Sequence, residues 1–103
     1  MKLKKKPEAC ENISEIRNAL DEIDLEIIHL FSIRHAYVKE IVKFKSGSEG
    51  IVASERKEQV LLQRKEWAEK RGLDPGFVED VFRLLIEKNI QLQFDIYNNK
   101  TID

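Results

Sequence analysis

The chain has 103 residues, of which 42% are hydrophobic and 36% are charged, and its net charge is −1. This composition is typical of one globular domain over residues 1–103, and it implies no field strong enough to attract nucleic acid. No apolar run approaches the length of a membrane-spanning helix, so we expect no membrane partner. The single cysteine, Cys10, allows no intrachain disulfide, which suits a reducing cytoplasm.

The one concentration of charge lies at the start of the chain, where four of the first six residues are lysines. Such a segment could be an arm that binds phosphates or a solvated terminus. No aromatic residue lies among the lysines to stack on bases, which favours the second interpretation. We therefore expect residues 1–11 to form a flexible basic N-terminus.

Two glycine-containing breaks, at residues 46–50 and 72–76, separate three long segments that have helical periodicity and no strand alternation. The fold class is therefore predicted to be all-α, with three helices in the chain. The first helix is predicted to run from residue 13 to residue 45, with Asn12 or Ser14 as its N-cap.

The other two helices have boundary signals of their own. The second is predicted over residues 54–71, with Ser54 as N-cap and a glycine directly after its end. The third is predicted over residues 75–98, because Asp74 can serve as N-cap and a proline then occupies the first helical position. Residues 99–103 are expected to fray.

The first helix is too long and too apolar for a compact monomer. About 33 residues at about 1.5 Å each span about 50 Å, whereas a chain of this size has a radius of gyration near 13 Å. Its apolar residues also lie on several sides, and a helix of this kind is buried on several sides. A second copy alongside provides the cover, which predicts an intertwined homodimer. The apolar residues include Ile16, Ile23, Ile27, Ile41, Leu25, Ile28, Phe31, Ile33 and Val42.

Polar side chains also occupy apolar faces. Arg34 and Lys45 share the line of isoleucines on the first helix, and Asn89 and Gln93 lie on the apolar stripe of the third. Arg56 falls in the first turn of the second helix, where the helix dipole disfavours a cation. Each cation could extend to water or pair with a carboxylate of its own helix. Together, these residues favour a buried pocket for a ligand with more than one negative charge.

The chain offers this pocket no evident covalent machinery. His29 and His35 point to different faces of the first helix, so they make a poor metal pair, and Cys10 does not complete a site. No serine or cysteine has an evident paired base, and the glycine-serine segment lacks the ending of a phosphate-binding loop. Cations and amides alone suit a reaction that needs positioning and charge stabilisation.

These residues, at this spacing, resemble the all-helical chorismate mutases, and more closely the isochorismate-pyruvate lyases of siderophore salicylate synthesis. The resemblance to the lyases covers residues 7–97 without gaps. No single motif is specific, and the resemblance depends on the whole set at fixed spacing. The stretches that carry it include Ile16-Arg17, Ile23-Asp24, Arg34, Phe44-Lys45, Glu55-Arg56, Trp67-Ala68-Glu69, Gly72-Leu73-Asp74, Phe77-Val78-Glu79 and Gln93.

The resemblance implies a homodimer of the chorismate mutase type II fold with two equivalent sites, each shared between the chains. In this interpretation Arg34 and Arg17 hold the two carboxylates of a small-molecule substrate, with Arg17 from the neighbouring chain, and Arg56 helps to hold a carboxylate. On the first helix, Arg17 projects about 100° away from the line of Arg34 and Lys45. Arg17 is therefore badly placed to share a pocket with them within one chain, and a second chain resolves this.

The same resemblance implies that Lys45 and Gln93 contact the ether oxygen that gains charge as the C–O bond breaks. Asn89 is a lesser contact in the pocket, and residues 46–50 form a mobile lid, which their glycines and serines permit. No cofactor and no metal are expected, and the enzyme is expected in the cytoplasm.

One departure separates the two activities. The mutases usually have a glutamate or glutamine directly after the arginine that matches Arg56, where it contacts the ring hydroxyl of chorismate, and this chain has Lys57 there. The loop between Lys45 and Arg56 also has the length found in the lyases. The sequence therefore favours a lyase that converts isochorismate to salicylate and pyruvate, with weak mutase activity. The alternatives are a chorismate mutase and a non-catalytic helical dimerisation or binding module.

Overall fold

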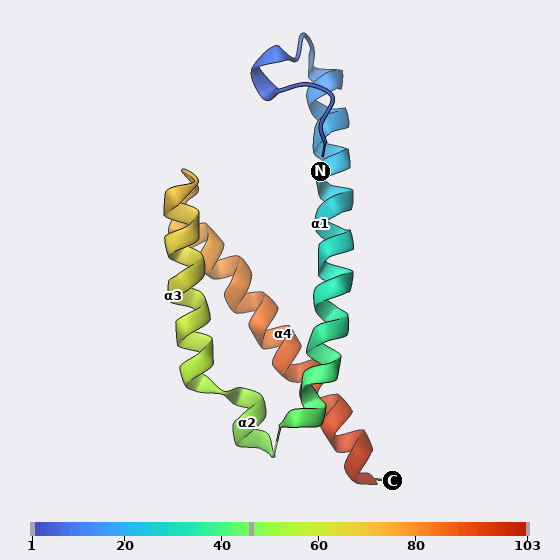
Figure 1. The fold of residues 1–103 in the computed structure, drawn as a ribbon, viewed down its shortest axis with the longest axis vertical. Coiled ribbons are helices and arrows are strands. Elements are labelled where there is room, and N and C mark those ends of the chain that lie inside the picture. The colour runs from blue at the N-terminus through green and yellow to red at the C-terminus, as the bar shows by residue number, and fades with distance from the viewer. Residues whose placement is uncertain (1, 46, 103) are drawn as a thin grey trace. The chain divides into compact units, whose positions relative to one another are not determined.

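The computed structural model describes residues 2–45 and 47–102, and every regular element in this part of the chain is helical. The predicted all-α class is therefore confirmed. The contacts divide the chain into two units, Met1–Ala36 and Tyr37–Asp103, which are described separately. None of the described helices is long and apolar enough to cross a membrane. The elements are η1 (Pro7–Ala9), α1 (Ile13–Ile41), η2 (Val42–Phe44), α2 (Ser48–Val52), α3 (Ser54–Lys70) and α4 (Pro75–Ile102) (Figure 1).

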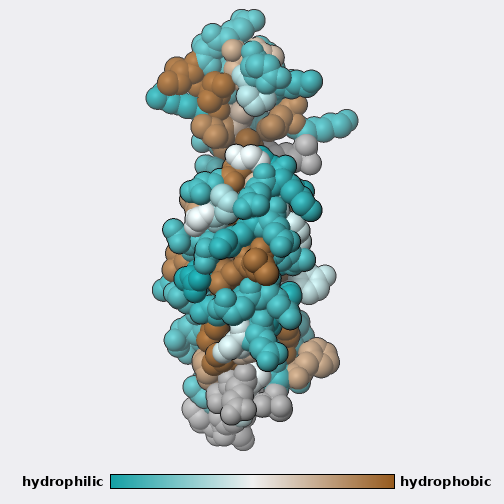
Figure 2. Space-filling model, turned by 90° about the vertical axis from the view of Figure 1, so that its left-hand side faces the viewer, coloured by the Kyte–Doolittle hydropathy of each residue, from teal (hydrophilic) through white to brown (hydrophobic). Residues whose placement is uncertain are grey.

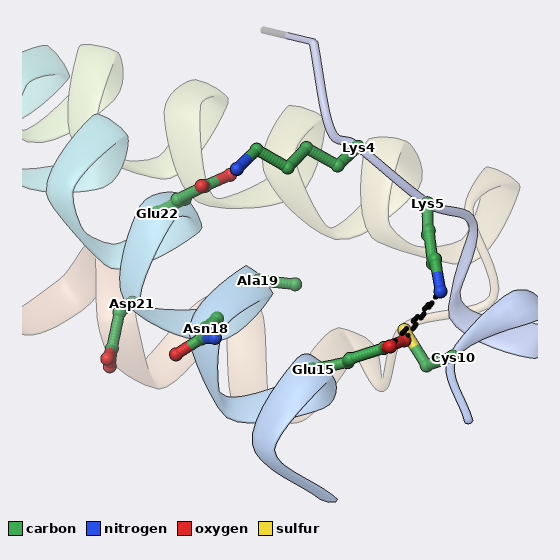
Figure 3. Close-up of a pocket in the computed structure, with 8 residues that line it drawn as sticks. All are labelled: Lys4, Lys5, Cys10, Glu15, Asn18, Ala19, Asp21 and Glu22. Carbon is green, nitrogen blue, oxygen red and sulfur yellow. Dashed lines mark hydrogen bonds and ion pairs between the residues drawn. The ribbon is translucent and has the colours of Figure 1, made fainter. Parts of the chain in front are cut away.

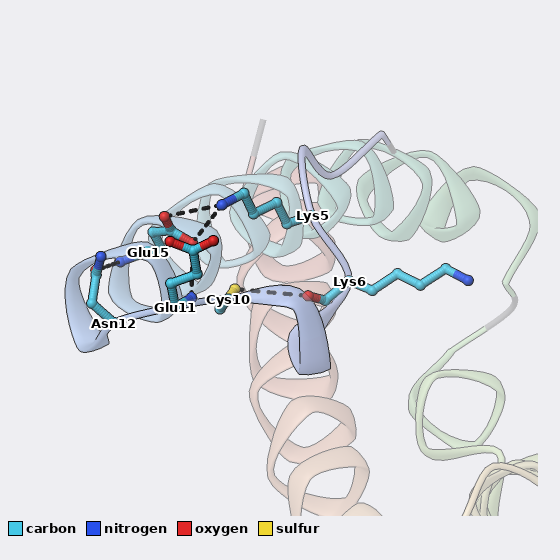
Figure 4. A network of polar contacts seen from close by, with 6 residues as sticks. All are labelled: Lys5, Lys6, Cys10, Glu11, Asn12 and Glu15. Carbon is cyan, nitrogen blue, oxygen red and sulfur yellow. Dashed lines mark hydrogen bonds and ion pairs between the residues drawn. The ribbon is translucent and has the colours of Figure 1, made fainter.

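Helix α1 begins at a side-chain cap. The Asn12 Oδ1 atom accepts a hydrogen bond from the backbone N–H of Glu15 at 2.9 Å, so Asn12 is the N-cap. The Glu15 carboxylate accepts a hydrogen bond from the backbone N–H of Glu11 at 3.1 Å (Figure 4). It also forms an ion pair with the ammonium of Lys5 at 3.0 Å. These contacts place a negative charge in the first turn, where the helix dipole favours it. They lower the pKa of Glu15, mainly through the hydrogen bond from Lys5.

The N-terminal residues have local structure of their own. The short helix η1 lies within the predicted flexible segment 1–11 and is followed by Cys10, whose thiol donates a weak hydrogen bond to the carbonyl of Lys6 at 3.7 Å (Figure 4). Together with the ion pair to α1, these contacts tie part of the segment to the first turn of that helix. The flexibility of the remaining residues stays a prediction.

Helix α1 has 29 residues and buries none of them. Its large apolar side chains are exposed in this chain, which is the surface expected of a helix that lacks its packing partner. The helix ends at Ile41 and tightens into η2, so the predicted end at residue 45 is close but the last turn is a 3-10 helix. The exposed residues are Ile13, Ile16, Leu20, Leu25, Ile27, Ile28, Leu30, Phe31, Ile33, Tyr37 and Ile41.

The connection to α3 differs from the sequence-based expectation. It contains the short helix α2, anchored by Ile51, whose side chain is 1% exposed. Ser54 was predicted as the N-cap of the second helix, and this is wrong. Ala53 holds that position with φ 42° and ψ 58°, and its carbonyl accepts the N–H of Lys57 at 3.0 Å. The left-handed backbone of Ala53 costs about 1–2 kcal/mol, and no glycine or asparagine at this position signals it in the sequence.

The turn between α3 and α4 follows its sequence signals. Gly72 has φ 73°, and the next N–H, that of Leu73, reaches back to the carbonyl of Ala68 at 2.9 Å. The Asp74 Oδ1 atom then accepts the N–H of Gly76 at 3.2 Å, which confirms the predicted N-cap of the third helix. Helix α4 continues to Ile102, because neither glycine nor proline follows Gly76 to stop it. The fraying predicted for residues 99–103 stays a prediction, and residue 103 lies outside the described residues.

Helices α3 and α4 form an antiparallel pair in the second unit (Figure 1). Helix α3 buries Val60, Leu61 and Ala68, and Lys65 forms an ion pair with Glu79 of α4 at 3.2 Å. Figure 2 views the molecule from the side on which α3 lies and shows a mostly hydrophilic outer surface with small separate hydrophobic patches. The pair therefore buries part of its apolar surface, while several large apolar side chains of the two helices stay exposed: Leu62, Trp67, Phe77, Val81 and Leu84.

Candidate active site

Lys45 lies between η2 and α2, both of which pack against α4. Its side chain is half-buried, and its Nζ donates to the backbone carbonyl of Ile51 at 3.5 Å. None of the described carboxylates forms an ion pair with it. Burial lowers the pKa of Lys45, because a poorly solvated ammonium is less stable in its charged form. An anionic ligand would provide the missing counter-charge.

Gly50 lies beside this lysine. A Cβ atom added at Gly50 would lie 3.6 Å from the Cβ of Lys45, so the backbone of α2 passes close to the lysine side chain. Residues 47–50 belong to the predicted lid, of which residues from Ser48 onward are helical here and Ser46 lies outside the described residues. The mobility of this lid stays a prediction.

Two amides on α4 have buried atoms without partners. Asn89 and Gln93 are one helical turn apart, so they share a face of α4. Gln93 is 6% exposed. The Nδ2 atom of Asn89 and the Oε1 atom of Gln93 are buried and have no hydrogen-bond partner. A buried polar atom left unpaired costs about 1–3 kcal/mol, so these atoms mark a place where a ligand or another chain can supply hydrogen bonds.

Lys45, Asn89 and Gln93 therefore belong to one packed unit, built from η2, α2 and α4 around the buried side chains Val42 and Ile51. The unit combines a cation that lacks an acidic partner with two unsatisfied amides. The ammonium of Lys45 and the Nδ2 atom of Asn89 are donors suited to stabilising negative charge, because they are in place before a ligand binds. The unpaired atom of Gln93 is an acceptor, Oε1, which needs a donor from a ligand or another chain.

The three arginines have different surroundings. Arg34 and Arg17 lie on α1 in the first unit, where Arg34 is half-buried and Arg17 is exposed. Burial lowers the pKa of Arg34. Arg56 is exposed in the first turn of α3 and lines a hollow of about 430 Å³ together with residues 53–55 and Gln59. The roles of all three in substrate binding stay predictions.

A second hollow, of about 410 Å³, lies beside the start of α1 (Figure 3). Its charged lining includes Lys4 and Lys5, but these are outnumbered by Glu15, Asp21 and Glu22, and Lys5 is already paired with Glu15. The sequence did not predict a site here. Its excess of carboxylates makes it unsuitable for a ligand with two negative charges.

Lys57, which the sequence analysis notes as a departure from the mutases, has partly buried surroundings in the structure. It is half-buried on α3, directly after the exposed Arg56. The signal that could have identified it is its spacing from Val60 and Leu61, which are three and four residues further along the helix and are buried. The apolar face of α3 therefore continues to Lys57.

Comparisons with known proteins identify the family of this chain. A family model for chorismate mutase type II matches residues 16–94. An isochorismate pyruvate lyase of Pseudomonas aeruginosa is 43% identical over 82 residues, which are 80% of this chain and 81% of that protein. A chorismate mutase of Methanocaldococcus jannaschii is 27% identical over 84 residues, 81% of this chain and 85% of that one. A T-protein of Haemophilus influenzae is 32% identical over 80 residues, 77% of this chain but 21% of that protein.

The chain therefore belongs to the chorismate mutase type II family. The family resemblance inferred from the sequence is confirmed, and so is the type II fold. The matched segment includes all six site residues named from the sequence, from Arg17 to Gln93.

The unsatisfied amide of Gln93 generates a stability prediction. Gln93→Met replaces a buried amide by an apolar side chain of similar size, so the thermal midpoint of the ligand-free protein should rise, by an amount corresponding to about 1 kcal/mol. The control is Gln91→Met, because Gln91 is exposed and only donates to Asp95 at 3.1 Å. Gln91→Met should leave the midpoint unchanged or slightly lower. Differential scanning calorimetry at one protein concentration measures both, and a clear drop for Gln93→Met would show that the amide is satisfied internally.

Proposed function

We propose that this protein is an isochorismate-pyruvate lyase, which converts isochorismate to salicylate and pyruvate, with weak chorismate mutase activity. The observation that carries the proposal is the 43% identity to a named isochorismate pyruvate lyase over four-fifths of both chains. The site supports it, since Lys45 and the α4 amides provide positive charge and hydrogen bonds without a nucleophile.

The reaction we propose is one concerted step. The ether C–O bond breaks as a hydrogen moves from the ring to the departing side chain, so the ring becomes aromatic and the side chain leaves as pyruvate. The protein then has to hold the reactive conformation and stabilise charge on the ether oxygen. We assign that charge stabilisation to the ammonium of Lys45 and the amide of Gln93. Asn89 is a lesser contact elsewhere in the pocket.

The carboxylates of the substrate are assigned to arginines. Arg34 would hold one carboxylate and Arg17 of the partner subunit the other, with Arg56 as an additional contact. The half-buried guanidinium of Arg34 supports this, because its burial removes water that a carboxylate would replace. The planar guanidinium can also bind a carboxylate through two parallel hydrogen bonds.

The assembly we propose is an intertwined homodimer in which each site takes residues from both chains. The observation that supports this assembly is the exposure of α1. This helix is about 44 Å long and buries no residue, although it has large apolar side chains along its length. A second copy would cover this surface and bring in the partner's arginine. A cytoplasmic location is also our proposal, supported by the presence of a single cysteine.

Chorismate mutase activity is the second candidate, favoured by the family that matches and by the relative from Methanocaldococcus jannaschii. Against it stands Lys57, at the position where the mutases have an acidic residue or an amide. A cation there is unsuitable as an acceptor for a substrate hydroxyl, since an ammonium has no acceptor atom. A non-catalytic binding module is the third candidate. In that case replacing Lys45 would affect at most the stability of the protein.

The first functional prediction concerns substrate choice. Purified protein should release salicylate and pyruvate from isochorismate with a higher kcat/KM than it converts chorismate to prephenate. The fluorescence of salicylate and the absorbance of prephenate after acid conversion to phenylpyruvate report the two reactions. More efficient formation of prephenate would replace the lyase by the mutase, and turnover of neither substrate would favour the binding module.

The second functional prediction concerns Lys45. Lys45→Met keeps the length of the side chain but removes its charge, so kcat should fall on the order of 100-fold or more. The thermal midpoint should stay the same or rise, because the half-buried ammonium has no acidic partner to lose. Lys43→Met is the matched control, since Lys43 is exposed and paired with Glu40. A folded Lys45→Met with the kcat of the control would remove this lysine from the mechanism.

A further inference from the structure

Lys57 lies on the side of α3 that faces α4. It precedes Val60 and Leu61, both buried against α4, by three and four residues, so the three side chains share one face of the helix. Lys57 is half-buried at this position, and none of the described carboxylates forms an ion pair with it. The neighbouring Arg56, by contrast, is exposed.

The pairing of α3 with α4 identifies the residue opposite Lys57. The guanidinium of Arg64 on α3 lies 5.7 Å from the centre of the Phe82 ring on α4. The helices are antiparallel, so two turns back along α3 from Arg64 correspond to two turns forward along α4 from Phe82. These steps of seven residues lead to Lys57 and to Asn89, on the same faces as the pair from which they start. The ion pair between Lys65 and Glu79 gives the same alignment to within about one turn.

Both groups that meet at this level are hydrogen-bond donors. The ammonium of Lys57 has three donors and no acceptor, and the Nδ2 atom of Asn89 is a buried donor without a partner. These donor atoms cannot satisfy each other, and one acceptor group placed beside both of them would satisfy both. Glu87, the acidic residue nearest to this level on α4, is exposed and forms no ion pair with Lys57.

We infer that Lys57 and Asn89 together bind one carboxylate of the substrate, between α3 and α4 of the same chain. The two oxygens of a carboxylate can accept hydrogen bonds from both groups at once, and the negative charge offsets the half-buried ammonium. The inference rests on the proposed function, because isochorismate has two carboxylates. It adds a substrate-binding residue to the arginines and gives a chemical reason for a lysine at this position.

The test compares variants by steady-state kinetics with isochorismate. Lys57→Gln should raise KM about tenfold or more with a much smaller change in kcat, since it removes one charged hydrogen bond to bound substrate. Lys57→Arg keeps the charge and should stay within a few-fold of wild type. Lys70→Gln, which changes an exposed lysine of the same helix, should have no effect. All variants should unfold at the temperature of wild type within a few degrees.

A double-mutant cycle tests the shared carboxylate. Asn89→Ala should also raise KM, and the variant with both Lys57→Gln and Asn89→Ala should lose less than the product of the two single effects, because both groups bind one anion. If wild type forms salicylate while Lys57→Gln keeps the KM of Lys70→Gln, or if the two effects multiply, the inference is wrong and the proposed function stands. If wild type forms no salicylate, the proposed function fails and the inference fails with it.

Discussion

The uncovered apolar surface of α1 is the constraint on which the rest of the account depends. Twenty-nine residues form this helix and none is buried, although isoleucine, leucine and phenylalanine side chains lie along it. Each square ångström of apolar surface removed from water contributes about 25 cal/mol to the free energy of unfolding. A chain whose α1 stays uncovered therefore lacks much of the stability that burial of this helix would provide. A second chain is the natural cover, and we propose that it brings Arg17 to a site that Arg34, Lys45 and Gln93 form from the other chain. In this account assembly and catalysis depend on the same helix.

The second unit contains polar groups whose burial is unfavourable without a ligand, as expected of the anion site that we propose. Lys45, Asn89 and Gln93 are polar groups in partly or fully buried positions, and the described residues offer them a carbonyl contact at 3.5 Å and no acidic partner. A protein selected for stability alone would have apolar side chains there. The proposed substrate can provide acceptors for Lys45 and Asn89, since it has two carboxylates and an ether oxygen that gains charge. The same buried polar groups therefore have two effects. They lower the stability of the empty site, and they stabilise charge when the substrate reacts.

Local signals explain what the sequence predicts well. Asn12 and Asp74 cap their helices through neighbouring N–H groups, and Gly72 ends α3 by adopting a positive φ, so a few consecutive residues are enough to place these boundaries. Helix α2 and the left-handed Ala53 could not be predicted in this way, because they depend on burial of Ile51 against elements far along the chain. The six site residues were named from helical projection and family resemblance. The pairing of Lys57 with Asn89 needed the alignment of two antiparallel helices, which no single stretch of sequence contains.

Subunit complementation tests the central claim, that each site is built from two chains. Arg17→Ala and Lys45→Ala homodimers should both be nearly inactive. When the two variants are unfolded together and refolded, about half of the dimers should be mixed with one intact site each, so activity should approach about a quarter of wild type. Refolding Lys45→Ala with Gln93→Ala is the control, since both residues are assigned to the same chain and no site is restored. If the first mixture stays inactive while mixed dimers form, or if the control mixture regains equal activity, the assignment of Arg17 to the partner subunit's site is contradicted.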